Sequence, residues 1–315
     1  PCGQPRGEFG SLMISDTMQT RSAKRDERRI VSFDAQEIAE WCDGAWDSHA
    51  PTGIAGVSND TRTLHPGNLY FAIAGDRLVG HDYVDQAFEH GASAAVVRRD
   101  WSVREKGMCL LRVADTRRAL GDVARGYRRK VNPDIVGVTG SAGKTSVKDM
   151  TAHILAAHTP TARSRGNWNN DIGLPLSLLA MDLNSRVGVF EVATNHPGEI
   201  SALCGILEPV WGVVTNIGAA HIGYFGSIEH IAEEKASLLR NLPAEGIAFL
   251  DCDDAYYGLL RESAPSRVVT ISARAPADYC ISKTVDATGI QIEEQQSGTS
   301  QRFELEHASD FHAVN

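Results

Sequence analysis

Hydrophobic residues recur in short runs along the chain, and their spacing predicts the elements of the fold. Four runs rich in β-branched residues, at 186–193, 210–217, 246–253 and 267–273, are typical of buried strands. The stretches between them have the apolar spacing of amphipathic helices. Strands that alternate with helices predict an α/β fold, with a mostly parallel sheet joined by right-handed crossovers.

The same pattern divides the chain into three parts. Residues 1–28 are polar and lack periodicity, so we expect a disordered or artefactual leader. Residues 29–115 alternate short strands and helices, which predicts a small α/β domain. Residues 116–315 predict a larger domain that starts with a helix over 116–131. After about residue 276 the alternation has a period of two, which is typical of antiparallel strands.

Composition and charge exclude several classes of function. The 315 residues are 42% hydrophobic and 23% charged, as in ordinary globular proteins. The net charge of -9 gives no support for a nucleic-acid partner. No apolar run approaches the ~20 residues that span a bilayer, so we expect no membrane insertion. The basic runs Arg117–Arg118 and Arg128–Lys130 are expected on the solvated face of their helix.

The six cysteines are scattered, and no Cys-x-x-Cys pair occurs. This spacing favours buried free thiols over disulfides or a zinc site. Free thiols are typical of a reducing compartment, so we expect a cytoplasmic protein.

The segment "IVGVTGSAGKTSVKDM" at 135–150 has the order strand, glycine turn, helix start. Glycines let backbone N–H groups converge on an anion, and the start of the helix adds its dipole. Lys144 could reach the outer phosphates of a nucleotide, and the Thr145 hydroxyl could ligate Mg²⁺. Val138 stands where the strict phosphate-loop pattern has glycine, so this is a variant loop. An ordinary glycine turn is the alternative; we predict phosphate binding.

Polar residues follow the ends of two further predicted strands. Glu191 follows "VGVF" and Asn216 follows "WGVVT". The carboxyl ends of parallel strands share one edge, so we expect these residues and the glycine loop to meet at one crevice. Glu191 is then placed to bind Mg²⁺, although a surface glutamate is the alternative. Glu199 is expected in the first turn of a helix, in a structural role.

Two loops near this crevice carry further candidates. Asn167, Asn169 and Asn170 form a polar turn that suits recognition of phosphate, peptide or carboxylate, or that caps a helix. His221 follows a strand end and is a candidate ligand of metal or phosphate. Ser227 should cap a helix over 228–239 that carries Lys235. This lysine is either exposed or turned toward a metal centre, where a carbamate on its Nζ would make it a carboxylate ligand.

Together these motifs resemble the Mur ligases, ATP-dependent amide-forming enzymes of peptidoglycan synthesis. The variant loop Thr139–Thr145 is shared across that family. The segments "GNWNNDIGLP", "EVATNHPGEI" and "TNIGAAHIGYFGSIEHIAEEK" resemble its branch that joins D-alanyl-D-alanine to UDP-N-acetylmuramoyl-tripeptide. Thr61–Arg62 and Gly80–His81 resemble motifs of its UDP-binding domain. The chain departs from the family pattern at Val79, in place of aspartate, and at Ala193, in place of glycine.

The resemblance implies a reaction and a set of roles. The γ-phosphoryl group of ATP would pass to the terminal carboxylate of the tripeptide, and the amine of D-alanyl-D-alanine would attack the acyl phosphate. A small N-terminal UDP-binding domain would precede a phosphate-loop domain in a monomer. The implied ATP-binding residues are Thr139, Gly140, Ser141, Ala142, Gly143, Lys144, Thr145, Ser146 and Asn216. The implied substrate-binding residues are Thr61, Arg62, Gly80, His81, Asn167, Asn169 and Asn170. The implied Mg²⁺ ligands are Thr145, Glu191, His221 and Lys235, and the implied catalytic residues are Lys144, Glu191, His221 and Lys235.

Two alternatives stay open at this point. A ligase such as folylpolyglutamate synthetase shares the loop, but lacks the UDP-domain pattern and the asparagine-rich turn. The family also has a third, Rossmann-like domain, and "FHAVN" at 311–315 resembles the start of the segment that leads to it. We therefore expect a truncated chain that is inactive alone, which makes a non-catalytic nucleotide-binding fragment the second alternative.

Overall fold

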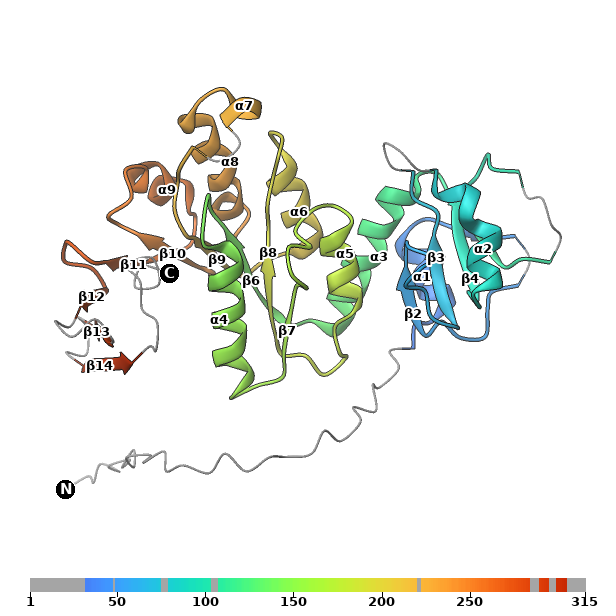
Figure 1. Ribbon diagram of the computed structural model, residues 1–315, viewed down its shortest axis with the longest axis horizontal. Helices are drawn as coiled ribbons and strands as arrows, with labels where there is room; N and C mark the ends of the chain where they lie inside the picture. The colour runs from blue at the N-terminus through green and yellow to red at the C-terminus, as the bar shows by residue number, and fades with distance from the viewer. Residues whose placement is uncertain are drawn as a thin grey trace, which may run out of the picture.

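The computed structural model describes residues 32–47, 49–74, 79–102, 107–219, 222–283, 289–294 and 299–304. These residues form two α/β units, one around each of two sheets, that lie side by side along the long axis (Figure 1). The predicted α/β fold class is confirmed. The leader predicted at 1–28 lies outside the described residues.

The first unit contains a five-stranded sheet in the order β1-β5-β4-β3-β2. Its strands are parallel except β1, which pairs antiparallel with β5. The strands are β1 (Ala45–Trp46), β2 (Gly56–Ser58), β3 (Asn68–Phe71), β4 (Ala94–Arg98) and β5 (Leu110–Val113). The helices of this unit are α1 (Ala35–Trp41), the 3-10 helix η1 (Gly80–Tyr83) and α2 (Val84–Glu89).

The second unit contains a nine-stranded sheet in the order β14-β13-β12-β11-β10-β9-β6-β8-β7. In this order, all strands from β12 through β6 to β7 are parallel to their neighbours. Strands β13 and β14 add the antiparallel extension that the period-two pattern predicts. The strands are β6 (Asp134–Thr139), β7 (Thr161–Arg163), β8 (Val187–Glu191), β9 (Trp211–Val214), β10 (Ile247–Asp251), β11 (Arg267–Ser272), β12 (Tyr279–Lys283), β13 (Gly289–Glu294) and β14 (Thr299–Glu304).

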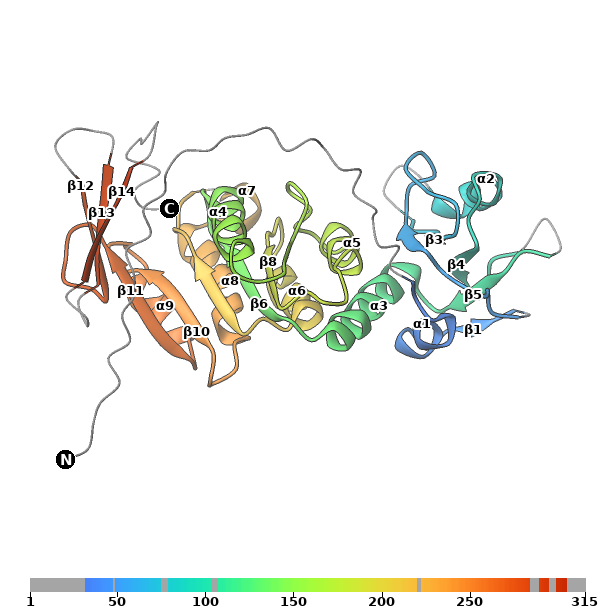
Figure 2. The ribbon, with the colours of Figure 1, turned by 90° about the horizontal axis from the view of Figure 1, so that it is seen from below.

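Helices cover both faces of the larger sheet (Figure 2). Alternate residues of β6 divide between the faces: Val136 and Val138 pack with α4, whereas Ile135 packs with Leu238 of α8 on the other side. This alternation is the period-two side-chain direction of a strand. The helices are α4 (Lys144–Ala156), α5 (Gly173–Leu179), α6 (Glu199–Leu207), α7 (Ile222–Phe225), α8 (Ile228–Arg240) and α9 (Tyr257–Ser263). None of the helices within the described ranges is long and apolar enough to cross a membrane.

Helix α3 (Thr116–Val131) joins the two units and has the predicted bounds. Asp115 caps its start, and Asn132 ends it in the left-handed conformation. Apolar residues of both units pack around α3 in one continuous core, to which the first unit contributes Phe71 and the second Leu178.

The prediction that Arg128 lies on the solvated face of α3 is wrong. Its side chain is buried, and the guanidinium donates to the carbonyl oxygens of Leu207 and Glu208, each at 3.0 Å. Carbonyl groups at the end of α6 lack partners within that helix, so they can accept from a buried guanidinium. Burial also lowers the pKa of Arg128.

The five cysteines in the described ranges are free thiols, as predicted. Only Cys42 and Cys204 are fully buried; Cys109, Cys252 and Cys280 are half-buried, so the predicted burial holds for two of the five.

Candidate active site

The glycine loop connects β6 to α4 in the predicted order. Gly143 precedes the helix with a φ of 79°, and Gly140 has a φ of 146°. A Cβ atom on Gly140 would lie 1.9 Å from Oγ1 of Thr215. Both the backbone conformation and this close approach therefore require glycine at position 140.

The segment that follows β9 holds the glycine loop from one side. The Ser141 N–H donates to the Asn216 carbonyl and the Ala142 N–H to Asn216 Oδ1, each at 2.9 Å. Ser141 Oγ donates to the Gly218 carbonyl at 3.0 Å. The loop and Asn216 thus meet as predicted, although Asn216 contacts the loop backbone itself.

The start of α4 presents unpaired donors. Among the described residues, no hydrogen-bond partner occurs for the N–H groups of Gly143, Lys144 and Thr145. Three such groups at one helix start, together with the helix dipole, can bind an anion. This arrangement fits a phosphate group at the loop.

Lys144 folds back over the loop. Its Nζ donates to the carbonyl oxygens of Gly140 at 2.9 Å and Ser141 at 3.4 Å. Burial lowers the pKa of Lys144, and the charge of Glu191 partly opposes this shift. The ammonium is therefore near enough to Glu191 to interact with its charge, and a phosphate could replace the carbonyl contacts of Lys144.

Glu191 is the last residue of β8 and is only 2% exposed, so the alternative of a surface glutamate is wrong. Its Oε2 accepts from Thr145 Oγ1 at 2.7 Å, and its Oε1 accepts from Asn169 Nδ2 at 2.8 Å. Carboxylate and hydroxyl oxygens are donors that suit Mg²⁺, which usually keeps several waters and binds few protein groups. The contact between Thr145 and Glu191 therefore fits a Mg²⁺ site. A larger metal cluster is absent from the described ranges, where no three histidine, cysteine, aspartate or glutamate side chains are grouped so that they could hold a metal.

The three asparagines of the polar turn lie in different surroundings. Asn169 contacts Glu191, and Asn167 is exposed. Asn170 Oδ1 accepts from the N–H groups of Gly173 at 2.8 Å and Ile172 at 3.3 Å, so it caps the start of α5. The capping role that the sequence offered is thus present at Asn170, and recognition of a ligand by this turn stays a prediction.

Lys235 lies on α8 and is 5% exposed, so the alternative of an exposed helix lysine is wrong. Burial and the charge of Lys144 lower its pKa to about 8, against the opposing effect of Glu234. Ser227 caps this helix as predicted, because its Oγ accepts a hydrogen bond from the His230 N–H at 3.2 Å. His221 lies outside the described residues.

Glu199 has the predicted structural role in the first turn of α6. Its carboxylate accepts from the N–H groups of Asn195 at 2.7 Å and His196 at 3.1 Å. These contacts stabilise the segment that connects Glu191, at the end of β8, to the start of α6.

The four candidates for UDP binding lie in the first unit. Thr61 is buried and donates to Gln86 Oε1 at 2.9 Å. A Cβ atom on Gly80 would lie 2.4 Å from the Ile73 carbonyl oxygen, so close packing of the backbone requires glycine at position 80. Buried His81 accepts at Nε2 from the N–H of Arg98 at 3.0 Å. Of the four, only Arg62 is exposed: its side chain is 85% accessible and paired with Asp60.

Sequence reasoning missed Lys148, which is fully buried beside this site. Its spacing of three and four residues from Thr145 and Lys144 places it on their face of α4. That spacing was the signal available in the sequence.

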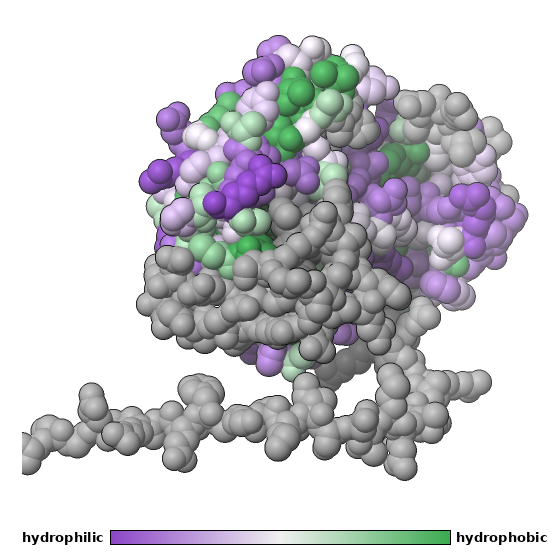
Figure 3. All heavy atoms as spheres, turned by 60° about the vertical axis from the view of Figure 1, so that its left-hand side comes forward, coloured by the Kyte–Doolittle hydropathy of each residue, from purple (hydrophilic) through white to green (hydrophobic). Residues whose placement is uncertain are grey.

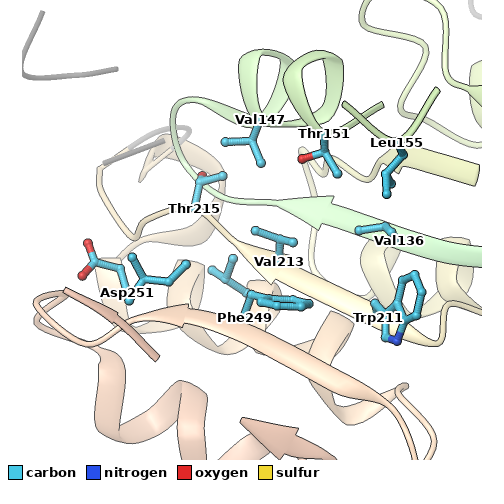
Figure 4. Close-up of a pocket in the computed structure, with 11 residues that line it drawn as sticks. Val136, Val147, Thr151, Leu155, Trp211, Val213, Thr215, Phe249 and Asp251 are labelled. Carbon is cyan, nitrogen blue, oxygen red and sulfur yellow. The ribbon is translucent and has the colours of Figure 1, made fainter. Parts of the chain in front are cut away.

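An apolar pocket of about 350 Å³ lies between α4 and strands β6, β9 and β10 (Figure 4). Its sheet side includes Val213 and Phe249, and its polar end includes Thr215 and Asp251. Burial raises the pKa of Asp251. A mainly apolar lining with one carboxylate does not suit phosphate groups, so the start of α4 is the better candidate for an anion site.

Helix α7, which follows β9 in the chain, carries exposed hydrophobic side chains. Figure 3 shows green hydrophobic atoms at the top of the described surface, where α7 lies; Ile222 is 43% and Tyr224 is 65% exposed. The Tyr224 ring contacts that of His196, with centroids 5.2 Å apart. This contact links α7 to the loop after Glu191.

Comparison with known proteins identifies relatives for both units. A family profile described as "Mur ligase middle domain" matches residues 138–315, and one described as "Mur ligase family, catalytic domain" matches residues 53–128. The UDP-N-acetylmuramoyl-tripeptide--D-alanyl-D-alanine ligases of Escherichia coli and Bacillus subtilis are 41% and 35% identical over 71% and 79% of this chain. The matches cover 49% and 54% of those proteins, so the chain spans about half the length of these curated relatives.

Solved structures agree with this relationship. The crystal structure of MurF from Acinetobacter baumannii has a TM-score of 0.83 and 28% identity; the match covers 90% of this chain and 63% of that one. MurF ligase from Thermotoga maritima in complex with ADP has a TM-score of 0.73 and 26% identity, over 82% of this chain and 60% of that one. With a matching profile over more than half of its residues and this fold, the chain belongs to the Mur ligase family.

Proposed function

We propose that this chain provides the nucleotide-binding and UDP-substrate-binding parts of an ATP-dependent ligase. The ligase would join D-alanyl-D-alanine to UDP-N-acetylmuramoyl-tripeptide in peptidoglycan synthesis, the activity in the name of the relatives at 41% and 35% identity. The observation that carries the proposal is the contact between Thr145 and Glu191 beside Lys144. It combines a phosphate-binding loop with a carboxylate that suits Mg²⁺.

The proposed chemistry needs no nucleophile from the protein. The terminal carboxylate of the tripeptide attacks the γ-phosphorus of ATP, which releases ADP and forms an acyl phosphate. The amine of D-alanyl-D-alanine then attacks the acyl carbon; inorganic phosphate leaves, the nitrogen loses a proton, and the amide remains. The N–H groups at the start of α4 and the Lys144 ammonium would bind the phosphates and stabilise the charge that develops on them.

Thr145 and Glu191 would hold Mg²⁺, with His221 and Lys235 near a second ion, as the family resemblance implies. When bound, Mg²⁺ neutralises phosphate charge and polarises the transferred group. Asn169 would keep Glu191 oriented through its hydrogen bond of 2.8 Å. Asn167, which is exposed, would be free to meet substrate.

Residues 29–115 would recognise the UDP end of the substrate, and residues 116–315 would bind ATP. The exposure of Arg62 supports the first assignment, since its guanidinium can exchange Asp60 for a phosphate. An ATP-dependent reaction on a UDP-linked precursor is expected in the cytoplasm. We further propose that the protein acts as a monomer.

The test is ADP release by the protein at the full length of its gene. Release should require both UDP-N-acetylmuramoyl-tripeptide and D-alanyl-D-alanine, and Lys144→Ala should weaken ATP binding by about 10–100-fold, because a charged hydrogen-bonding group is lost. Lys130→Ala is the matched control, because Lys130 is paired with Glu37 in the first unit.

The outcomes separate the alternatives. ADP release that needs no UDP-linked precursor would favour a ligase such as folylpolyglutamate synthetase. ATP binding without release by the full-length protein would favour a non-catalytic nucleotide-binding protein.

A further inference from the structure

Lys148 is fully buried on α4, yet the proposed chemistry gives it no role. Its ammonium donates to the carbonyl oxygens of Ser164 at 3.0 Å and Gly166 at 2.9 Å. Asp149 Oδ1 lies 3.3 Å away and completes its contacts among the described residues. A buried ammonium is costly unless it is paired, so these carbonyl contacts hold both the lysine and the loop in place.

Helix α4 therefore contacts the loop and β8 at two levels, one turn apart. Thr145 donates to Glu191 at the upper level, and Lys148, three residues later on the same face, binds the backbone of residues 164–166 at the lower level. Gly166 has a φ of 47°, in the left-handed region, at the point where Lys148 binds its carbonyl.

The loop that Lys148 binds is the one that surrounds Glu191. Ser164 Oγ accepts from the Glu191 N–H at 3.2 Å, and Asn169 donates to Glu191 Oε1 at 2.8 Å. The Ala193 N–H donates to the Asn169 carbonyl at 3.1 Å. A displacement of residues 164–166 would thus move Ser164, which contacts the Glu191 backbone, and would disturb the turn that continues to Asn169, which contacts the carboxylate.

We propose that Lys148 is a positioning residue that sets Glu191 for Mg²⁺ by anchoring residues 164–169 to the phosphate-loop helix. The inference rests on the proposed function, because it uses the assignment of Glu191. It differs from a role in stability alone in one respect. Loss of the anchor should weaken binding of the metal–nucleotide complex and spare the contacts that Lys144 and the start of α4 make with the phosphates.

The experiment measures the affinity of the chain for ADP by calorimetry, once with Mg²⁺ and once with a chelator. The ratio of the two affinities is the gain due to Mg²⁺. In Lys148→Met this gain should fall at least about fivefold, which is the effect of one lost hydrogen bond that orients a charged group. The affinity for ADP without Mg²⁺ should change less than about twofold. Arg165, exposed in the anchored loop, should also be cleaved faster by trypsin in the variant.

Two further variants guard against a trivial loss of stability. Leu260→Ala removes a buried side chain from a separate core, and it should lower thermal stability without changing the gain due to Mg²⁺. Lys148→Gln is the second test if the methionine variant does not fold, because its amide still donates a hydrogen bond inside the protein. Its side chain is one atom shorter than that of lysine, so it should not hold the carbonyl groups of both Ser164 and Gly166. It carries the same expectation for the gain.

Three results would overturn the inference. An unchanged gain in a folded Lys148 variant would limit Lys148 to packing, and unfolding of both variants would assign it to stability alone. If the parent chain does not bind ADP with Mg²⁺ at all, the proposed function fails and the inference fails with it. A parent that binds while a folded variant keeps its full gain would reject the inference and leave the proposed function standing.

Discussion

Replacing Lys235 by methionine should stabilise the folded chain at neutral pH. The burial of Lys235 and the charge of Lys144 lower its pKa from 10.5 to about 8. Between these two values the unfolded chain binds more protons than the folded chain, so the free energy of unfolding rises with pH. The destabilising effect of the ammonium is thus fully present below about pH 8 and disappears as the pH approaches 10.5.

The size of the effect follows from the shift. A difference of about 2.5 pH units corresponds to about 3 kcal/mol, since one unit is about 1.4 kcal/mol. Methionine has nearly the length of lysine and carries no charge, so it leaves little cavity and no buried ammonium. Lys235→Met should therefore raise the free energy of unfolding by up to about 3 kcal/mol at pH 7 and by much less near pH 10.

Urea unfolding of both chains, in a chelator and without nucleotide, measures the difference at several pH values between about 7 and 10. Intact-protein mass spectrometry checks that Lys235 of the parent is not carbamylated. Lys130→Met is the control, because its half-exposed ion pair with Glu37 should contribute less than about 1 kcal/mol. A variant that is less stable than the parent at pH 7, or a gain that does not shrink with rising pH, would refute the reasoning.

Three further variants test the loop, the metal site and the first unit. Gly140→Ala should lower the free energy of unfolding by at least about 1–3 kcal/mol, through its φ of 146° and overlap with Thr215, whereas Gly205→Ala, which meets nothing within 4 Å, should not. Glu191→Gln should reduce ADP release by the full-length protein at least about a hundredfold, and equal rates would reject a metal-binding role. Arg62→Ala should weaken binding of UDP-N-acetylmuramoyl-tripeptide by about tenfold in calorimetry, with unchanged unfolding; unaltered affinity would remove Arg62 from the substrate site.

The elements of the fold could be predicted because burial leaves a local pattern. Helix α3 has the predicted bounds, and α8 extends one residue beyond its predicted end. Glu191 lies at the end of β8, as the run of apolar residues before it indicates. These features depend on residues close in the sequence, where periodicity carries the information.

Contacts between distant segments could not be predicted in the same way. Arg128 and Lys148 look like surface cations in their own helices, but each is buried against carbonyl groups of another segment. His81 resembles a ligand-binding residue, yet its Nε2 accepts a backbone hydrogen bond inside the first unit. A backbone carbonyl is available at every position, so sequence does not mark which one accepts from a buried cation.

A physical reason why a chain with a net charge of -9 could bind a polyanion is offered by three lysines, Lys144, Lys148 and Lys235. Lys148 is satisfied by two carbonyls and a carboxylate. Among the described residues, Lys144 donates hydrogen bonds to carbonyl groups only, and Lys235 donates none. The charge of Lys144 contributes to the lowered pKa of Lys235. A phosphate near both lysines would relieve their repulsion and favour both charges. The unfavourable burial of Lys235 is therefore consistent with a site arranged for a bound anion, in which stability of the empty protein is reduced for the sake of binding.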